Sequence, residues 1–149
     1  MKNLNLFWPR ASFVVFSTAL FFCKFAFAEI KIVAGKKSAL DTMTLESAKD
    51  LYLGRKLGGD GLRGLKPLDR LDSANNTRSR FYKTLMGWSV ARTKAHWSQL
   101  VFTGKGDAPQ SVASLQELVK RLQDDEMAIG FIAGEEDSAD LKVLLKINE

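Results

Sequence analysis

The residues best suited to chemistry lie between positions 69 and 80, where arginines and neutral hydrogen-bond donors surround the expected start of a helix. Backbone amides at a helix start point outward, and the helix dipole favours an anion there. We therefore predict that Thr77, Asn76 and Arg78 bind a small anion, with Thr77 as the helix cap. The same segment holds further donors at Arg70, Ser73, Ser79 and Arg80. The alternative is a plain cap at Thr77 with arginines that only face water.

A second candidate contact is Ser38, in the loop that follows the first expected strand. Open α/β sheets bind ligands in loops at the carboxyl ends of their strands. Lys36 and Lys37 precede Ser38 and add positive charge. We therefore include Ser38 among the residues expected to bind the anion, against the alternative of two exposed lysines with no ligand.

Other chemistries lack the residues that they need. Cys23 is the only cysteine and His96 the only histidine, so the usual ligands of a metal site cannot be assembled. No Ser–His–acid triad and no general acid–base pair can be named, which predicts no catalytic residues. Gly106 follows Lys105, where a nucleotide-binding loop needs Ser or Thr. We predict a protein that is not an enzyme and that carries no metal and no cofactor.

Residues 1–28 have the composition of a secretory signal peptide. A basic start precedes an apolar run over residues 11–23, and Ala26 and Ala28 offer the small residues that a signal peptidase reads. We expect cleavage after Ala28 and a periplasmic mature protein. The alternative is an uncleaved membrane anchor, for which the apolar run is short.

Cleavage would also change the charge of the protein. The leader holds three of the 22 Lys and Arg residues and none of the 17 Asp and Glu residues, so the mature chain would carry a net charge of only +2. No long basic stripe remains in it. The basic isoelectric point therefore does not indicate a nucleic-acid partner.

Residues 29–149 are predicted to form one α/β domain without internal repeats. Apolar alternation predicts strands over residues 29–34, 65–71, 127–132 and 141–147. Helices are expected to begin at four caps, Thr44, Thr77, Ser89 and Ser114. Pro67 places the second strand at a sheet edge or an irregularity. Strands at both ends with helices between them indicate a mixed sheet covered by helices.

The order of these segments resembles a known group of proteins. The most specific runs are residues 44–55 (TLESAKDLYLGR) and 96–106 (HWSQLVFTGKG), followed by residues 128–132 (AIGFI) and 142–144 (KVL). They are similar to small phosphate ABC transporter substrate-binding-like proteins of the periplasmic binding protein superfamily, of a single-lobe type. In full-length phosphate binders a Ser-Gly-Thr-like element begins a helix before an aromatic residue. Only Thr77, ahead of Phe81, matches that element here.

The resemblance implies a single periplasmic-binding-protein-like lobe that binds phosphate or another small oxyanion. It also implies an ABC permease or a sensor protein as partner. A single lobe leaves part of the anion in water, which weakens charge-assisted bonds. We therefore expect weak binding by the monomer, and a homodimer would supply the missing wall. The alternative function is a ligand-free periplasmic protein–protein interaction module derived from such a lobe.

Overall fold

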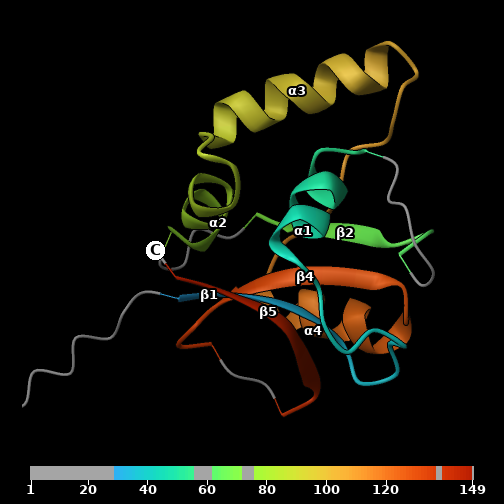
Figure 1. The fold of residues 1–149 in the computed structure, drawn as a ribbon, viewed down its shortest axis with the longest axis vertical. Coiled ribbons are helices and arrows are strands. Elements are labelled where there is room, and N and C mark those ends of the chain that lie inside the picture. Colours follow the sequence, from blue (N-terminus) through green and yellow to red (C-terminus); the bar gives the residue numbers. More distant parts are fainter. Residues whose placement is uncertain (1–28, 56–61, 72–75, 137–138, 149) are drawn as a thin grey trace, which may run out of the picture.

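The computed structural model describes residues 29–55, 62–71, 76–136 and 139–148. Its elements in chain order are β1 (Glu29–Gly35), α1 (Leu45–Tyr52), β2 (Lys66–Arg70), α2 (Thr77–Met86), α3 (Val90–Phe102), β3 (Gln110–Val112), α4 (Leu115–Asp124), β4 (Ala128–Ala133) and β5 (Leu141–Asn148). The strands form one sheet in the order β3-β2-β4-β1-β5. Figure 1 shows this sheet with helices on its faces, which confirms the predicted α/β class.

Three of the four predicted helix caps are confirmed. The side chains of Thr44, Ser89 and Ser114 each accept a hydrogen bond from the backbone N–H three residues later, at the starts of α1, α3 and α4. Each bond satisfies an amide that has no partner inside the helix. Glu117 also reaches back in α4, where its Oε2 accepts from the N–H of Ala113 at 2.8 Å. These helices therefore begin where local sequence says they should.

The sheet is mixed because its central strands run in different directions. β1 pairs antiparallel with both β4 and β5, whereas β2 pairs parallel with both β4 and β3. The carboxyl ends of β2 and β4 therefore lie at one end of the sheet, and the carboxyl end of β1 lies at the other. This arrangement decides which of the candidate residues can share a site.

Pro67 indicated a sheet edge or an irregularity, and the sheet edge is wrong, since β2 lies between β3 and β4. The N–H of Lys66 donates to the carbonyl of Met127, next to β4, at 2.9 Å. Successive residues of a strand point to opposite neighbours, so the nitrogen of Pro67 faces the other side, where pairing with β3 begins only at Leu68. The proline thus occupies a position where no ladder bond is lost.

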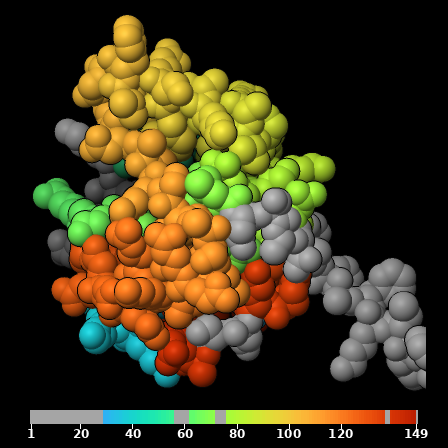
Figure 2. All heavy atoms as spheres, turned by 180° about the vertical axis from the view of Figure 1, so that it is seen from behind, coloured from blue at the N-terminus to red at the C-terminus, as the bar shows by residue number. Residues whose placement is uncertain are grey.

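Helices cover the sheet on two sides. One core packs α1 and α2 against the face formed by β1, β4 and β5, and the other packs α4 against β2, β3 and β4. Figure 1 shows α1 and α2 above β4, β1 and β5 and α4 on the other side of these strands, and Figure 2 shows α4, in orange, from behind. The sheet is therefore the middle layer of three.

An aromatic cluster fixes α1 and α2 on the sheet. Phe81 of α2 stacks on Phe131 of β4 with ring centroids 3.9 Å apart and planes at 4°. Tyr52 of α1 meets Phe81 edge-on at 4.7 Å, and its hydroxyl donates to the carbonyl of Leu68 at 3.1 Å. All three rings are fully buried. Because Phe81 lies one turn into α2, this stacking holds the start of α2 close to the end of the sheet.

The helix α3 stands apart from these layers (Figures 1 and 2). Only Thr93 and Trp97 of its thirteen residues are buried, and Phe102 at its end is 92% exposed. Trp97 packs against the backbone of Gly54, where an added Cβ would come within 2.7 Å of the indole ring. Within the described ranges, no helix combines the length and the apolar character needed to cross a membrane.

Candidate anion site

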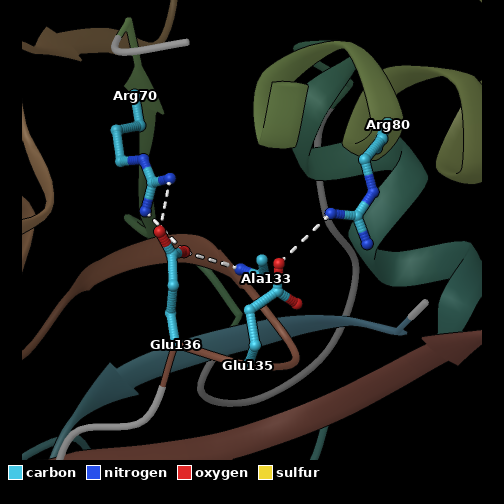
Figure 3. Close-up of polar contacts among 5 residues, drawn as sticks. All are labelled: Arg70, Arg80, Ala133, Glu135 and Glu136. Carbon is cyan, nitrogen blue, oxygen red and sulfur yellow. Dashed lines mark hydrogen bonds and ion pairs between the residues drawn. The ribbon is translucent and has the colours of Figure 1, made fainter. Parts of the chain in front are cut away.

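The candidate site lies at the end of the sheet where the parallel strands β2 and β4 finish. Asp69 and Arg70 close β2, and the chain turns directly after Ala133 at the end of β4. The first turns of α2 lie at the same end, as Figure 3 shows for Arg80. Two strand ends, a turn and a helix start therefore converge there, and the basic side chains of the predicted segment come with them.

Arg70 is the central residue of this end of the sheet. Its side chain has no exposed surface, and its guanidinium forms a two-pronged ion pair with Glu136. Nη1 donates to Oε2 at 2.7 Å and Nη2 donates to Oε1 at 2.9 Å. The backbone N–H of Ala133 donates to the same Oε2 at 2.8 Å (Figure 3). We call these donors, the Arg70 guanidinium and the Ala133 N–H, the Arg70 cradle.

The Arg70 cradle has the chemistry of an oxyanion receptor. Three donors converge on two oxygens of one carboxylate, and forked bonds from a guanidinium are among the strongest and most directional that a protein makes. The cradle is nearly closed to water, since the Glu136 side chain that fills it is only 13% exposed. Low exposure strengthens each charged contact because little water competes for it.

Arg78, in the first turn of α2, is also paired. Its Nε donates to Oδ1 of Asp69 at 2.9 Å, and its Nη2 donates to Oδ2 of the same carboxylate. Burial raises the pKa of the neighbouring Tyr82 hydroxyl well above its usual value, and the charge of Asp69 adds to the effect. Tyr82 is therefore neutral at any ordinary pH. The Asp69 carboxylate offsets the charge that Arg78 was predicted to offer an anion.

Arg80, two residues after Arg78 in α2, pairs with a carboxylate at the surface. Its Nη1 lies 3.6 Å from Oε1 of Glu135, whose side chain is half exposed. The pair is drawn in Figure 3. An ion pair this exposed contributes little to stability, because water and salt screen it. Among the described residues, each arginine of the predicted segment thus meets a carboxylate of its own chain.

The structure corrects the predicted cap of α2. The N-cap residue is Asn76, not Thr77, and Asn76 is exposed with φ 54° in the left-handed region and makes no side-chain capping bond. Asparagine visits that region more readily than most residues. Thr77 is the first residue of the helix, and its side chain is fully buried. Thr77 and Asn76 do lie beside Arg78, as predicted, but Thr77 lies beneath the surface of the site.

Ser38 lies at the other end of the sheet. It follows β1, which runs antiparallel to β4, and its N–H donates to the carbonyl of Gly35 at 3.0 Å. Its own carbonyl accepts from Nζ of Lys142 at 2.9 Å. The six residues of β4 separate the two ends, a distance of roughly 16 Å at about 3.3 Å per residue. One small anion therefore cannot contact both Ser38 and Thr77.

Sequence reasoning missed the residues that complete the cradle. Glu136 belongs to an acidic loop with nothing in its local pattern to tie it to Arg70, which lies 66 positions earlier. Ala133 contributes only a backbone N–H, which no side-chain pattern reveals. The pairing of β2 with β4 brings them together, and that pairing joins segments far apart in the sequence. In the described ranges, no group of three or more His, Cys, Asp and Glu residues is placed to hold a metal ion.

Comparison with solved structures identifies the fold. An ABC-type phosphate transport receptor from Vibrio cholerae matches with a TM-score of 0.56 and 16% identity, over 78% of this chain and 45% of that one. A candidate phosphate ABC transporter substrate-binding protein from Clostridium perfringens, solved with bound phosphate, matches with a TM-score of 0.58 and 19% identity, over 78% and 44%. A candidate phosphate-binding protein from Planctomyces limnophilus gives 0.53 and 15%, over 78% and 40%.

This chain therefore spans less than half the length of each of these proteins, and the likeness is one of fold. It matches about one lobe of them, as the resemblance in sequence implied. No family model matches the sequence. No curated protein matches it either.

Proposed function

We propose that this protein is a periplasmic solute-binding-type lobe that binds phosphate or a similar small oxyanion weakly. The observation that carries the proposal is the Arg70 cradle, in which a buried guanidinium and a backbone N–H already hold a two-oxygen anion, the Glu136 carboxylate. Phosphate presents oxygens at a similar spacing and carries more charge. The fold shared with phosphate-binding proteins supports the same ligand class.

The start of α2 would supply the remaining contacts. Asn76 is exposed there, and Arg78 uses two of the five N–H donors of its guanidinium on Asp69. The backbone amides of the first helical turn, beginning with Thr77, point out of the helix end. Asn76, Thr77 and Arg78 thus remain in the proposed site, whereas Ser38 lies outside it, at the other end of the sheet.

Two features make the proposed affinity weak. The neighbouring carboxylates reduce the positive charge that an anion meets, and a single lobe provides no opposite wall. A homodimer is one way to provide that wall, and it is part of the proposal. The proposal includes export through a leader that is cleaved after Ala28. It also includes delivery of the anion to an ABC permease or a sensor protein. The site binds an anion and releases it unchanged, and we propose no chemical reaction there.

Calorimetry with inorganic phosphate tests the proposal on the purified protein. We expect a dissociation constant between about 1 μM and 1 mM, which corresponds to roughly −8 to −4 kcal/mol. Arg70→Lys keeps the charge but loses the forked geometry, so it should weaken binding at least about tenfold, or about 1.4 kcal/mol. Arg92→Lys, on the projecting helix α3, is the matched control and should change nothing.

Two results would contradict the proposal. Absence of measurable phosphate or sulfate binding at millimolar concentration would remove the function. Submicromolar binding by a monomer would refute the weak-affinity claim and the argument from a single lobe.

A second candidate function, a ligand-free interaction module, rests on the groove beside α3, which Arg78 also lines. A groove of about 660 Å³ runs between α3 and the body of the protein, lined by Leu71, Trp97, Val101 and Phe102 among others. Phe102 is 92% exposed and Val101 and Leu71 are about half exposed. Under this alternative, Phe102→Ser abolishes the binding of a protein partner, while Arg70→Lys, which lies outside the groove, leaves it intact. Under the first proposal, Arg70→Lys weakens phosphate binding and Phe102→Ser does not.

A further inference from the structure

We infer that Glu136 is a built-in occupant of the oxyanion site, so that a solute anion binds by displacing the Glu136 carboxylate from the Arg70 cradle. This inference rests on the proposed function and adds a regulatory step to it. The apparent affinity for phosphate is then set by competition inside the chain as well as by the contacts to phosphate.

Arg70 needs a counter-charge at all times. Its side chain is fully buried, and a buried guanidinium without an anion is strongly disfavoured. Glu136 supplies the anion with two oxygens on the guanidinium fork and a third contact from the Ala133 N–H. A phosphate that entered would take over these same three donors. The two anions therefore exclude each other.

The Glu136 carboxylate can leave the Arg70 cradle without unfolding its surroundings. The backbone of Glu136 is held by its own turn, in which its N–H donates to the carbonyl of Ala133 at 2.9 Å. Gly134 in the same turn donates to the carbonyl of Glu29 at 2.7 Å. These bonds do not involve the carboxylate. The Glu136 side chain is 13% exposed, so rotation about its own bonds moves the carboxylate into water.

The geometry of the Arg70 cradle decides which anion can replace the Glu136 carboxylate. The donors converge on two oxygens that lie in one plane, at distances of 2.7 to 2.9 Å. Compact oxyanions such as phosphate and sulfate present a separate oxygen to each prong of the fork, whereas a halide offers both prongs only one acceptor and is held less well. The ligand class is therefore a small oxyanion, and chloride should not compete at equal ionic strength.

The test compares Glu136→Gln with the wild type in a phosphate titration. Glutamine keeps the size of the side chain but removes the negative charge that competes. When a site is open only part of the time, its apparent affinity falls by that open fraction, so removing the competitor should tighten phosphate binding by at least about tenfold. Glu136→Ala empties the site further and should bind phosphate at least as tightly as Glu136→Gln.

The neighbouring residue provides the matched control. Glu135→Gln removes the same charge one position earlier, from a half-exposed side chain outside the cradle. It should leave phosphate affinity within about twofold of the wild type, because exposed charges are screened. If Glu135→Gln tightens binding as much as Glu136→Gln, the effect is one of general charge and the inference is overturned.

Thermal melting covers the case in which a variant folds poorly. Phosphate stabilises whichever form binds it, in proportion to the logarithm of its concentration over the dissociation constant. Between 0 and about 100 mM phosphate at constant ionic strength, Glu136→Gln should gain more in melting temperature than the wild type. Equal gains would overturn the inference.

The outcomes separate this inference from the proposed function. If the wild type binds phosphate and neither Glu136 variant binds it more tightly, the proposed function stands and the displacement of Glu136 is wrong. If neither the wild type nor any variant binds phosphate or sulfate, both fail.

Discussion

The ion pair between Arg70 and Glu136 can be tested without any ligand, through its contribution to stability. Removing one partner of a fully buried pair costs about 3–5 kcal/mol, because the other charge is left without compensation. Here the Arg70 side chain is fully buried and that of Glu136 is 13% exposed. We therefore expect Glu136→Gln to lower the free energy of unfolding by about 2–3 kcal/mol, below the fully buried range.

The reverse change should cost less. Arg70→Met removes the buried charge itself and keeps most of the side-chain volume, and it leaves Glu136 free to turn its carboxylate toward water. We expect a loss of about 1–2 kcal/mol for Arg70→Met alone, and a double variant that is no less stable than Glu136→Gln, because the buried charge that lost its Glu136 partner is gone. The coupling energy between the two positions should then be about 1–2 kcal/mol.

Urea unfolding followed by circular dichroism, in buffer free of phosphate and sulfate, measures all four proteins. The double-mutant cycle isolates the pair from the effects of each substitution alone. A coupling energy below about 0.5 kcal/mol would mean that the two residues act independently. That result would refute the argument that Arg70 depends on Glu136 for its counter-charge.

Two further predictions concern the scaffold and its pH dependence. Gly35→Ala would place a Cβ 1.8 Å from the backbone carbonyl oxygen of Leu122, so we expect a loss of about 3 kcal/mol or more in urea unfolding. Gly106→Ala, whose Cβ would meet nothing closer than 3.8 Å, should stay within about 0.5 kcal/mol. The hydrogen bond from Lys66 lowers the pKa of Asp125 below its usual 3.8. The stabilisation by the Lys66–Asp125 ion pair is present above pH 3.8 and is lost as the pH falls through the lower pKa of Asp125 in the folded state. Both side chains are at least one-third exposed, so Lys66→Met should be less stable than the wild type by at most about 1 kcal/mol at neutral pH. The difference in stability between Lys66→Met and the wild type should vanish in acid. A difference that persists there would contradict the ion pair with Asp125 as its cause.

Local sequence predicted most of the helices because caps act over three or four residues. Ser89 and Ser114 begin α3 and α4 as predicted, and the glycine at position 87 ends α2 with φ 70°. The short strand β3 was not predicted, because its three residues include only one buried side chain. A strand of that kind is defined by its neighbour β2 and not by its own pattern.

The candidate site was predicted in part, and the reason is the range of the interactions. Arg78 and Asn76 lie close together because they are neighbours in sequence. Ser38 was grouped with them because it follows one predicted strand and they follow another. The direction of a strand within a sheet depends on its pairing with residues that are far away in the sequence. The antiparallel pairing of β1 with β4 sends Ser38 to the far end. The carboxylates that pair with Arg70 and Arg78 were likewise beyond the reach of local patterns.

The proposed function depends above all on where a small anion binds this protein. Nuclear magnetic resonance of the ¹⁵N-labelled protein, titrated with phosphate at constant ionic strength, locates that contact directly. We predict saturable shifts of the Ala133 amide, of the amides at the start of α2 and of the Arg70 side-chain N–H groups, with the Ser38 amide unchanged. Shifts confined to the Ser38 end of the sheet, or no saturable shift at Ala133 and Arg70, would contradict the proposed site.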